Sequence, residues 1–169
     1  METQPDIGTP DPHTRRITDF LRQIGLTIRF EPIPVRTFLP GILIHDGGLT
    51  VDVTALRHPG DLLHEAGHLA VVPQRERCAL GGYVGKNPAD EMAAIAWSWA
   101  ALRHLGLEPE VVFHPEGYRG ASASLINAFA QDMGPGTPLL EWYGLTSAGM
   151  PTSDPAMPLF PTMSRWLRE

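Results

Sequence analysis

The sequence predicts an α+β fold, with a small antiparallel sheet near the N-terminus and helices after it. Strand-like alternation of apolar residues is concentrated in residues 26–53, and helical apolar spacing precedes and follows this region. Asp46-Gly47 in the middle of it is a strong signal for the tight turn of a hairpin. A chain of 169 residues is typical of one domain with a buried core, so we expect residues 1–169 to form a single domain.

The N-terminal third predicts a helix followed by three strands. Residues 1–13 are polar and proline-bearing, which predicts a flexible arm and does not resemble a secretory signal peptide. A helix is predicted over residues 14–24, where apolar residues fall at helical spacing and Gly25 follows. Residues 26–32 alternate like a strand, and residues 41–53 predict a β-hairpin.

The middle of the chain predicts two buried helices. Pro59 and Pro73 frame a helix over residues 61–72, with Asp61 as its cap. Residues 75–86 predict a glycine-rich loop or a short strand. Asn87 and Pro88 begin a helix over residues 89–105 that is apolar on nearly every side, so we expect it to be central, with Trp97 and Trp99 in the core.

The C-terminal third predicts shorter elements. Residues 109–120 predict a strand followed by a turn, and residues 121–133 predict an amphipathic helix. Residues 138–161 predict a coil punctuated by prolines, densest over residues 150–161, and residues 161–169 predict a final helical turn or two.

Composition excludes several classes of function. The net charge is −6 and the basic residues are scattered, whereas nucleic-acid binding needs clustered Lys and Arg, so no nucleic-acid partner is expected. No apolar run approaches the ~20 residues that span a bilayer, so no membrane association is expected. The single cysteine, Cys78, cannot form an internal disulfide or a cysteine ligand set. With no export signal, these features favour a cytoplasmic protein; its oligomeric state is not indicated.

The motif that carries chemistry is His64-Glu65-Ala66-Gly67-His68, which matches H-E-x-x-H. One α-helical turn is 3.6 residues, so His64 and His68 leave the same face of a helix and can reach one metal ion. Glu65 is offset by one residue, beside the ion, where it can act as a general base toward water. The alternative is a metal-free helix with two hydrogen-bonded histidines. Its apolar neighbours make that alternative costly, because the motif would be buried without a metal.

A catalytic zinc usually has three protein ligands, so a third ligand must lie elsewhere in the chain. Glu91 is the favoured candidate, because it opens the buried helix and shares a face with that helix's apolar stripe. Asp90 competes with it, but an acid at this position also stabilises the free N–H groups of a helix start. His104 and His114 are further candidates, each with the alternative of a solvated histidine or a substrate contact.

HEAGH followed by a glutamate at the start of a helix rich in small residues resembles the zincin metallopeptidases. The resemblance covers about residues 61–102 and is closest to the gluzincins, including the compact bacterial zinc peptidases of the ImmA/IrrE type. It implies a small zincin-like domain whose buried helical core carries the motif. It also implies Zn²⁺ bound by His64, His68 and Glu91, Glu65 as general base, and a peptide or protein substrate. No helix-turn-helix segment is evident, so the resemblance does not extend to cleavage of a repressor.

A peptidase also needs a hydrogen-bond donor for the oxyanion of the transition state. The turn FHPEGYRG offers His114 and Tyr118, and we predict that one of them has this role; the alternative is that both lie on a surface turn. Tyr83 is a weaker candidate. The predicted function is a zinc-dependent metallopeptidase. The alternatives are a zincin-fold metal-binding protein with little catalysis that serves as an interaction module, and a metal-free interaction domain.

Overall fold

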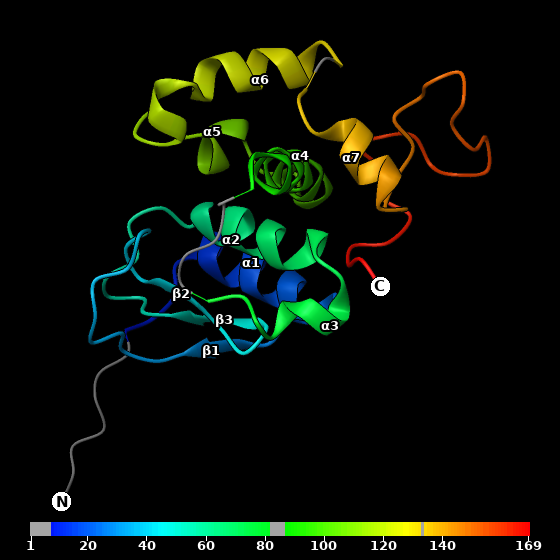
Figure 1. Cartoon of the computed structure of the whole chain (residues 1–169). Coiled ribbons are helices and arrows are strands. Elements are labelled where there is room, and N and C mark those ends of the chain that lie inside the picture. The colour runs from blue at the N-terminus through cyan, green and yellow to red at the C-terminus, as the bar shows by residue number, and fades with distance from the viewer. Residues whose placement is uncertain (1–7, 82–86, 133) are drawn as a thin grey trace, which may run out of the picture.

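The protein has an α+β fold, as predicted, in which a small sheet and three helices form successive layers (Figure 1). This computed structural model describes residues 8–81, 87–132 and 134–169. Helices α1 (Pro12–Gln23) and α2 (Asp61–Val71) contact the sheet, and α4 (Pro88–Leu105) packs on α2. Helices α5 (Pro109–Val112), α6 (Ser122–Ala130) and α7 (Thr137–Trp142) follow around α4. The helix with the H-E-x-x-H motif is therefore enclosed between the sheet and α4.

The sheet has three strands in the order β1-β3-β2. Strands β2 (Ile42–His45) and β3 (Gly48–Val51) form the predicted antiparallel hairpin, with Asp46 and Gly47 at positive φ in its turn. Strand β1 (Ile28–Phe30) pairs parallel to β3, so the prediction of an antiparallel sheet is wrong for this strand. All four residues of β3 are buried, which favours the central position for this strand. Gly48 admits the backbone of Thr27, whose carbonyl oxygen would lie 2.4 Å from a Cβ at this position.

Most predicted helices are present, with local differences at their starts. Helix α1 begins at Pro12, because the Asp11 side chain accepts hydrogen bonds from the backbone N–H groups of His13 and Thr14. Residues 12 and 13 therefore belong to this helix and not to an arm; residues 1–7 lie outside the described residues. Helix α4 begins after Asn87, which caps it as predicted, and ends at Gly106 in the left-handed conformation. Helix α6 lies within the predicted range.

Three short helices correct the sequence prediction. Helix α5 occupies the start of the region predicted as a strand, where Pro109 begins it and Val111 packs against the backbone of Gly60. Helix α3 (Gln74–Arg77) follows Pro73 within the predicted loop, and residues 82–86 of that loop lie outside the described residues. Helix α7 lies at the start of the predicted coil, and the proline-rich segment 150–161 is coil as predicted.

The predicted C-terminal helical turn is absent, because residues near the C-terminus contact α1, α2 and α4 instead. The Trp97 indole N–H donates to the backbone oxygen of Trp166 at 2.8 Å, and the Trp166 ring packs against Phe20. The backbone N–H of Arg168 donates to Ala70 at 2.9 Å. These contacts hold residues 161–169 in a non-helical course of turns and bends, and they outweigh the local helical preference of this segment.

The C-terminal end of α2 is held by two arginines. Arg77 Nε donates to the Leu69 carbonyl at 2.9 Å, and Arg168 Nη1 donates to the Val71 carbonyl at 3.2 Å. The last carbonyls of a helix have no partner within it, and α2 is buried along almost its whole length. The arginines therefore satisfy backbone groups that water does not reach, and they fix one end of the motif helix.

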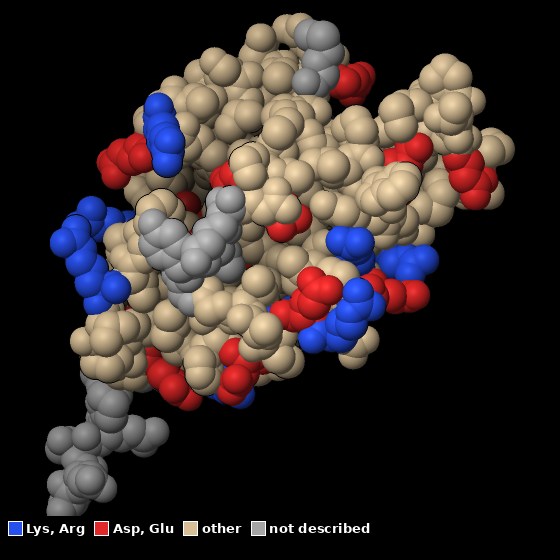
Figure 2. All heavy atoms as spheres, viewed as in Figure 1, with Lys and Arg blue, Asp and Glu red and all other residues tan. Residues whose placement is uncertain are grey.

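The core is a continuous hydrophobic cluster that includes residues of the sheet, α1, α2 and α4. Trp97 and Trp99 lie in it as predicted, with exposed fractions of 0% and 5%. Among the described residues, no helix combines the length and apolar character needed to cross a bilayer. On the face shown in Figure 2, basic side chains lie in small groups among acidic ones, in keeping with their scattered sequence positions.

Asp52, which follows β3, accepts several hydrogen bonds that contribute to folding stability. The Asp52 carboxylate accepts hydrogen bonds from the backbone N–H groups of Ile33 and Thr54, both at 3.0 Å, and from the Thr54 hydroxyl at 2.7 Å. The bond from the Thr54 hydroxyl, together with those backbone bonds, holds the pKa of Asp52 below its usual value of 3.8. Asp52 therefore stabilises the fold above pH 3.8, and this contribution is lost as the pH falls through the lower pKa of the folded state.

We predict that Asp52→Asn lowers the free energy of unfolding at pH 7 by about 1–3 kcal/mol, because the amide nitrogen cannot accept a hydrogen bond. The difference from the wild type should shrink in acid, where the wild-type carboxyl is protonated. Urea unfolding between pH 7 and pH 2 measures both effects. Asp19→Asn is the control, since Asp19 is exposed and lies 3.7 Å from Arg22. A difference that does not change with pH would contradict this account of Asp52.

Candidate metal centre

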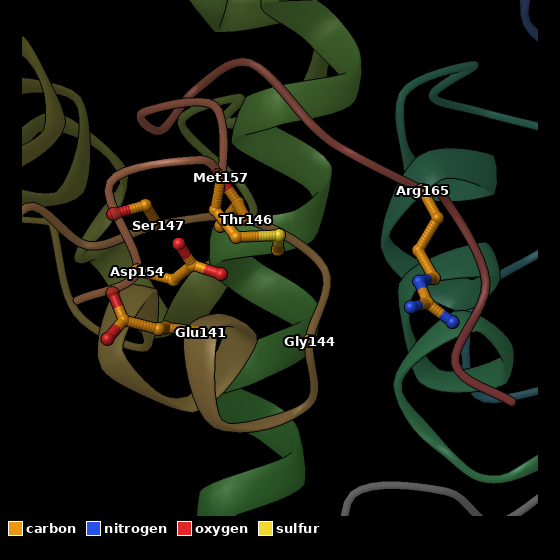
Figure 3. A pocket seen from close by; sticks show the side chains of 7 residues that line it. All are labelled: Glu141, Gly144, Thr146, Ser147, Asp154, Met157 and Arg165. Atoms are coloured by element: carbon orange, nitrogen blue, oxygen red, sulfur yellow. The ribbon is translucent and has the colours of Figure 1, made fainter.

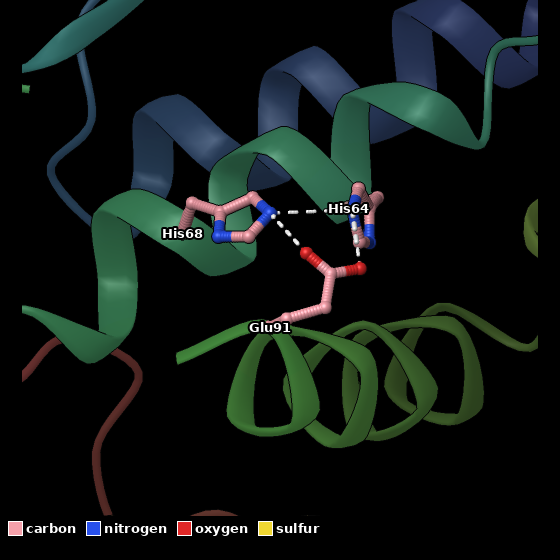
Figure 4. Close-up of side chains that lie close together, drawn as sticks. All are labelled: His64, His68 and Glu91. Atoms are coloured by element: carbon pink, nitrogen blue, oxygen red, sulfur yellow. Dashed lines mark hydrogen bonds and ion pairs between the residues drawn. The ribbon is translucent and has the colours of Figure 1, made fainter. Parts of the chain in front are cut away.

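The site begins with the two histidines of α2. His64 and His68 lie one turn apart, and Figure 4 shows both side chains directed toward α4. Their Nε2 atoms are 3.2 Å apart, and their rings are nearly perpendicular. The spacing in the motif thus brings one nitrogen of each ring to the same point beside the helix.

Glu91, from the first turn of α4, lies between these nitrogens (Figure 4). Its Oε1 is 3.4 Å from Nε2 of His64, and its Oε2 is 3.2 Å from Nε2 of His68. Asp90, the competing candidate, points elsewhere: its carboxylate accepts a hydrogen bond from the Tyr143 hydroxyl at 3.4 Å. The structure therefore brings together the three residues predicted as ligands, from two helices.

The geometry of this cluster fits a tetrahedral metal ion. One ligand atom from each of His64, His68 and Glu91 can be chosen so that all lie within 4.8 Å of one another. Zinc–nitrogen and zinc–oxygen bonds of about 2.0–2.1 Å in a tetrahedron place neighbouring ligand atoms roughly 3.3 Å apart. The two histidine nitrogens are 3.2 Å apart, and each lies 3.2–3.4 Å from one of the two oxygens of Glu91, Oε1 facing His64 and Oε2 facing His68. A rotation of the Glu91 carboxylate that brings one oxygen toward both histidines would complete a three-ligand set for such an ion.

The short distance between the helices depends on Gly67, inside the motif. A Cβ at this position would lie 2.8 Å from the carbonyl oxygen of Ala94 and 3.1 Å from its Cα. Real Cβ atoms do not approach a backbone oxygen so closely, so any side chain at residue 67 would push α4 away. Glu91 lies one helical turn before Ala94 and reaches the histidines only while this contact is kept.

Burial adjusts the protonation of the cluster in the direction that metal binding needs. Burial lowers the pKa of His64 to about 4, helped by the charge of His68 and opposed by that of Glu91. His64 is therefore neutral at pH 7, with a free lone pair on one nitrogen. Burial by itself would raise the pKa of Glu91, but the hydrogen bond from His68 and the charges of His64, His68 and Arg119 outweigh it. The net shift is downward, so Glu91 is a carboxylate.

Glu65 lies beside the cluster and is not one of its three members. Its exposed fraction is 8%, and burial raises the pKa of its carboxyl to about 7. The charge of His68 opposes this rise, and those of Asp61 and Glu91 add to it. A carboxyl with a pKa near 7 exchanges protons readily at neutral pH, which suits the predicted role of general base.

Tyr118 is brought to the site by the turn after α5. Its hydroxyl lies 3.3 Å from Nδ1 of His64, and its ring meets the imidazole edge to face. His64 thus faces Glu91 with one ring nitrogen and Tyr118 with the other. A partner on the second nitrogen orients a metal-ligating histidine and selects its tautomer. Tyr118 therefore contacts the cluster and does not simply lie on a surface turn. Its role as a hydrogen-bond donor to an oxyanion stays a prediction.

The other predicted candidates lie outside the cluster. His114 points to Asp61, whose Oδ1 is 3.0 Å from its Nε2, and it is buried. His104 packs against the rings of Phe20 and Trp166. Neither histidine belongs with His64, His68 and Glu91, and Tyr83 lies outside the described residues. His114 therefore contacts Asp61 and is not a third ligand of this cluster.

Asp61 is the residue whose role the sequence analysis missed. It was predicted to cap α2, but Gly60 holds that position and the Asp61 carboxylate turns to His114. The signal was its spacing: residues 61, 64, 65 and 68 fall on one face of a helix. Asp61 thus extends the polar face formed by His64, Glu65 and His68 by one helical turn toward the start of α2.

A separate pocket of about 350 Å³ lies beside α7 and the C-terminal coil (Figure 3). None of the predicted site residues lines it. The Glu141 carboxylate in its wall already accepts hydrogen bonds from the Ser153 hydroxyl and the backbone N–H of Ala148. Arg165 lies apart from the acidic side chains in Figure 3. The lining residues are Glu141, Gly144, Thr146, Ser147, Asp154, Met157 and Arg165.

Comparison of this chain with protein-family models, with curated proteins and with solved structures finds no significant match. A function for it must therefore follow from the residues of the site and their geometry.

We predict that Gly67→Ala lowers the free energy of unfolding by about 1–3 kcal/mol, because the added methyl group overlaps the backbone of Ala94. This loss exceeds the gain of at most about 1 kcal/mol that alanine brings to a helix. Urea unfolding of the metal-free protein measures the change. Gly81→Ala is the control, since nothing lies within 4 Å of its added Cβ. Equal stability of Gly67→Ala and the wild type would contradict the close crossing.

Proposed function

We propose that this chain is a zinc-dependent metallopeptidase of the zincin type. His64, His68 and Glu91 would hold the zinc ion, and Glu65 would act as general base in the hydrolysis of a peptide bond. One observation carries the proposal: a carboxylate from a second helix lies 3.2–3.4 Å from both motif histidines, while another buried carboxyl stands beside them. Two histidines and a glutamate are a ligand set of catalytic zinc.

Zinc supplies Lewis acidity when bound, which polarises a carbonyl and makes water acidic enough to attack it near neutral pH. Structural zinc sites use four protein ligands, whereas catalytic sites use three and keep one position open. The described cluster has three members, and the Glu91 side chain is 37% exposed. These features favour a site that a substrate can reach.

Glu65 would move the protons of the reaction. Its carboxylate oxygen accepts a proton from the attacking water and returns it to the nitrogen of the leaving amine. A pKa of about 7 suits both transfers, because neither protonation state is strongly favoured at neutral pH. A site with a purely structural metal has no use for such a group, so Glu65 favours catalysis over simple metal binding.

Tyr118 would serve as a hydrogen-bond donor at the site. Burial raises the pKa of its hydroxyl, and the charges of Asp61, Glu91 and Glu65 add to this rise while a hydrogen bond with Ser98 opposes it. The hydroxyl therefore keeps its proton at neutral pH. A protonated hydroxyl next to His64 can donate toward negative charge that develops on a carbonyl oxygen.

The first test concerns the metal. We expect purified protein to retain about one zinc ion per chain after dialysis, as a three-ligand site should. His68→Ala and Glu91→Ala should each lower zinc affinity by more than about 100-fold, since removal of a ligand costs more than removal of its supporting partner. Atomic absorption measures the content, and competition with a chromophoric chelator measures the affinity.

Asp90→Ala is the matched control, because Asp90 neighbours Glu91 but bonds to Tyr143. It should bind zinc like the wild type. Zinc content far below one per chain in the wild type, or equal zinc affinity in all these forms, would overturn the proposed centre.

The second test separates catalysis from metal binding. Glu65→Gln should retain zinc, because Glu65 is not a ligand, and should lower kcat by about 10²–10⁴-fold, because glutamine cannot carry the proton. Cleavage of a fluorogenic peptide library measures the rate, with His68→Ala as the control for contaminating peptidases. Equal zinc content with no cleavage by wild type or variant would instead support a metal-binding protein without hydrolysis.

A further inference from the structure

We propose that Asp61 and His114 form a positioning pair, which anchors residues 113–121 to the start of α2 and so holds the Tyr118 hydroxyl on His64. The inference rests on the proposed function only for the chemical roles of His64 and Tyr118. Nothing in the H-E-x-x-H motif itself assigns a role to either member of the pair.

The pair joins two segments through a buried contact. Asp61 Oδ1 lies 3.0 Å from His114 Nε2, and the exposed fractions of the two residues are 6% and 8%. A buried carboxylate requires a partner, because its loss of hydration is otherwise uncompensated. The other ring nitrogen of His114, Nδ1, is buried and has no hydrogen-bond partner within the described part of the chain. Asp61 is therefore the polar contact that orients this ring.

His114 also forms the base of the turn that carries Tyr118. Its carbonyl oxygen accepts hydrogen bonds from the backbone N–H of Gly117 at 3.0 Å and from the Ser122 hydroxyl at 2.7 Å. The turn is thus held at its start by His114 and at its end by the first residue of α6. A displacement of His114 would be transmitted to the whole turn.

The backbone of this turn needs such an anchor. Tyr118 and Arg119 have φ angles of +53°, and Gly120 follows with a φ of +84°. Residues with a side chain are strained in the left-handed region, and two in succession persist only where surrounding contacts hold them. Strain of this kind at a candidate active site indicates a conformation required by function, because a relaxed turn would be more stable.

The anchored turn meets α2 at two points, one helical turn apart. Asp61 holds His114, and His64, three residues later on the same face, receives the Tyr118 hydroxyl at 3.3 Å. The Tyr118 ring also packs against Phe113, at a distance of 5.0 Å between ring centres. Loss of the first contact should therefore release the second. Asp61 and His114 act on the site through Tyr118 and do not touch the ligand nitrogens themselves.

The contact between His58 and Glu116 provides a control variant, Glu116→Gln. The His58 ring stacks on that of His114 at 3.6 Å, and its Nε2 lies 3.3 Å from the carboxylate of Glu116, which is 74% exposed. Glu116→Gln changes this outer ion pair and leaves the contact between Asp61 and His114 in place. It lies in the same turn, so it also reports any general sensitivity of the turn to substitution.

The experiment measures the chemical shifts of the His64 ring nitrogens by ¹H–¹⁵N NMR at fixed pH. It uses the metal-free protein, so its outcome depends neither on bound zinc nor on activity. Tyr118→Phe removes the hydroxyl and should shift the His64 Nδ1 resonance. Asp61→Ala and His114→Gln should produce the same shift, and Asp61→Ala combined with Tyr118→Phe should add nothing further. Asp61→Asn keeps an oxygen acceptor for His114 and should resemble the wild type, as should Glu116→Gln.

Zinc affinity provides the second readout. Asp61→Ala, His114→Gln and Tyr118→Phe should each weaken zinc binding by about 10-fold, the effect of removing a partner of a ligating histidine, and their effects should not multiply. A wild-type His64 resonance in Asp61→Ala, or multiplying effects in the double variant, would overturn the pair's role. If Asp61→Ala does not fold, His114→Gln decides in the same way. A wild type that binds no zinc would overturn the proposed function alone, since the metal-free resonance still reports the pair.

Discussion

Where α2 crosses α4, the absence of a side chain at Gly67 lets the Ala94 carbonyl approach to 2.8 Å from the place a Cβ would occupy. His64 and His68 flank this glycine on one helix, and Glu91 lies one turn before Ala94 on the other. The contact that packs the core therefore also sets the distances between the three side chains of the candidate metal centre. A looser crossing would leave two histidines on α2 and a glutamate on α4 with no common point between them.

The polar side chains on the buried helix α2 need hydrogen-bond or charged partners from other segments. This requirement explains where several of those segments pack. Glu91 meets the two histidines, Tyr118 reaches the second nitrogen of His64, and His114 pairs with Asp61. The backbone carbonyls at the far end of α2 are bonded by Arg77 and Arg168. The same burial raises the pKa of Glu65 and lowers that of His64, so packing and the protonation of the site have one cause.

The sequence predicted the parts of this fold that depend on local spacing. The hairpin follows from Asp46-Gly47 between apolar arms, and α4 follows from Asn87 and an apolar run. Glu91 was favoured over Asp90 because an acid at residue 90 has a structural role at the helix start. The predictions failed where a tertiary contact outweighed local preference. Residues 109–112 form a helix against Gly60, and residues 161–169 are not helical because their backbone bonds to α2 and Trp97. The carboxylate of Asp61 pairs with a histidine fifty-three residues later, which its position at a helix start does not indicate.

Spacing along the chain is enough to predict which side chains share a face of α2, because helical geometry depends on that spacing alone. It thereby determined that His64 and His68 can approach one ion and that Glu65 stands beside it. Which distant residues complete that face depends on how the other segments pack against α2. Glu91, Tyr118 and His114 arrive from a neighbouring helix and a left-handed turn, and their approach depends on the missing side chain at Gly67 and on buried charges that need partners. Close packing and desolvation act between segments, so spacing along the chain does not encode them.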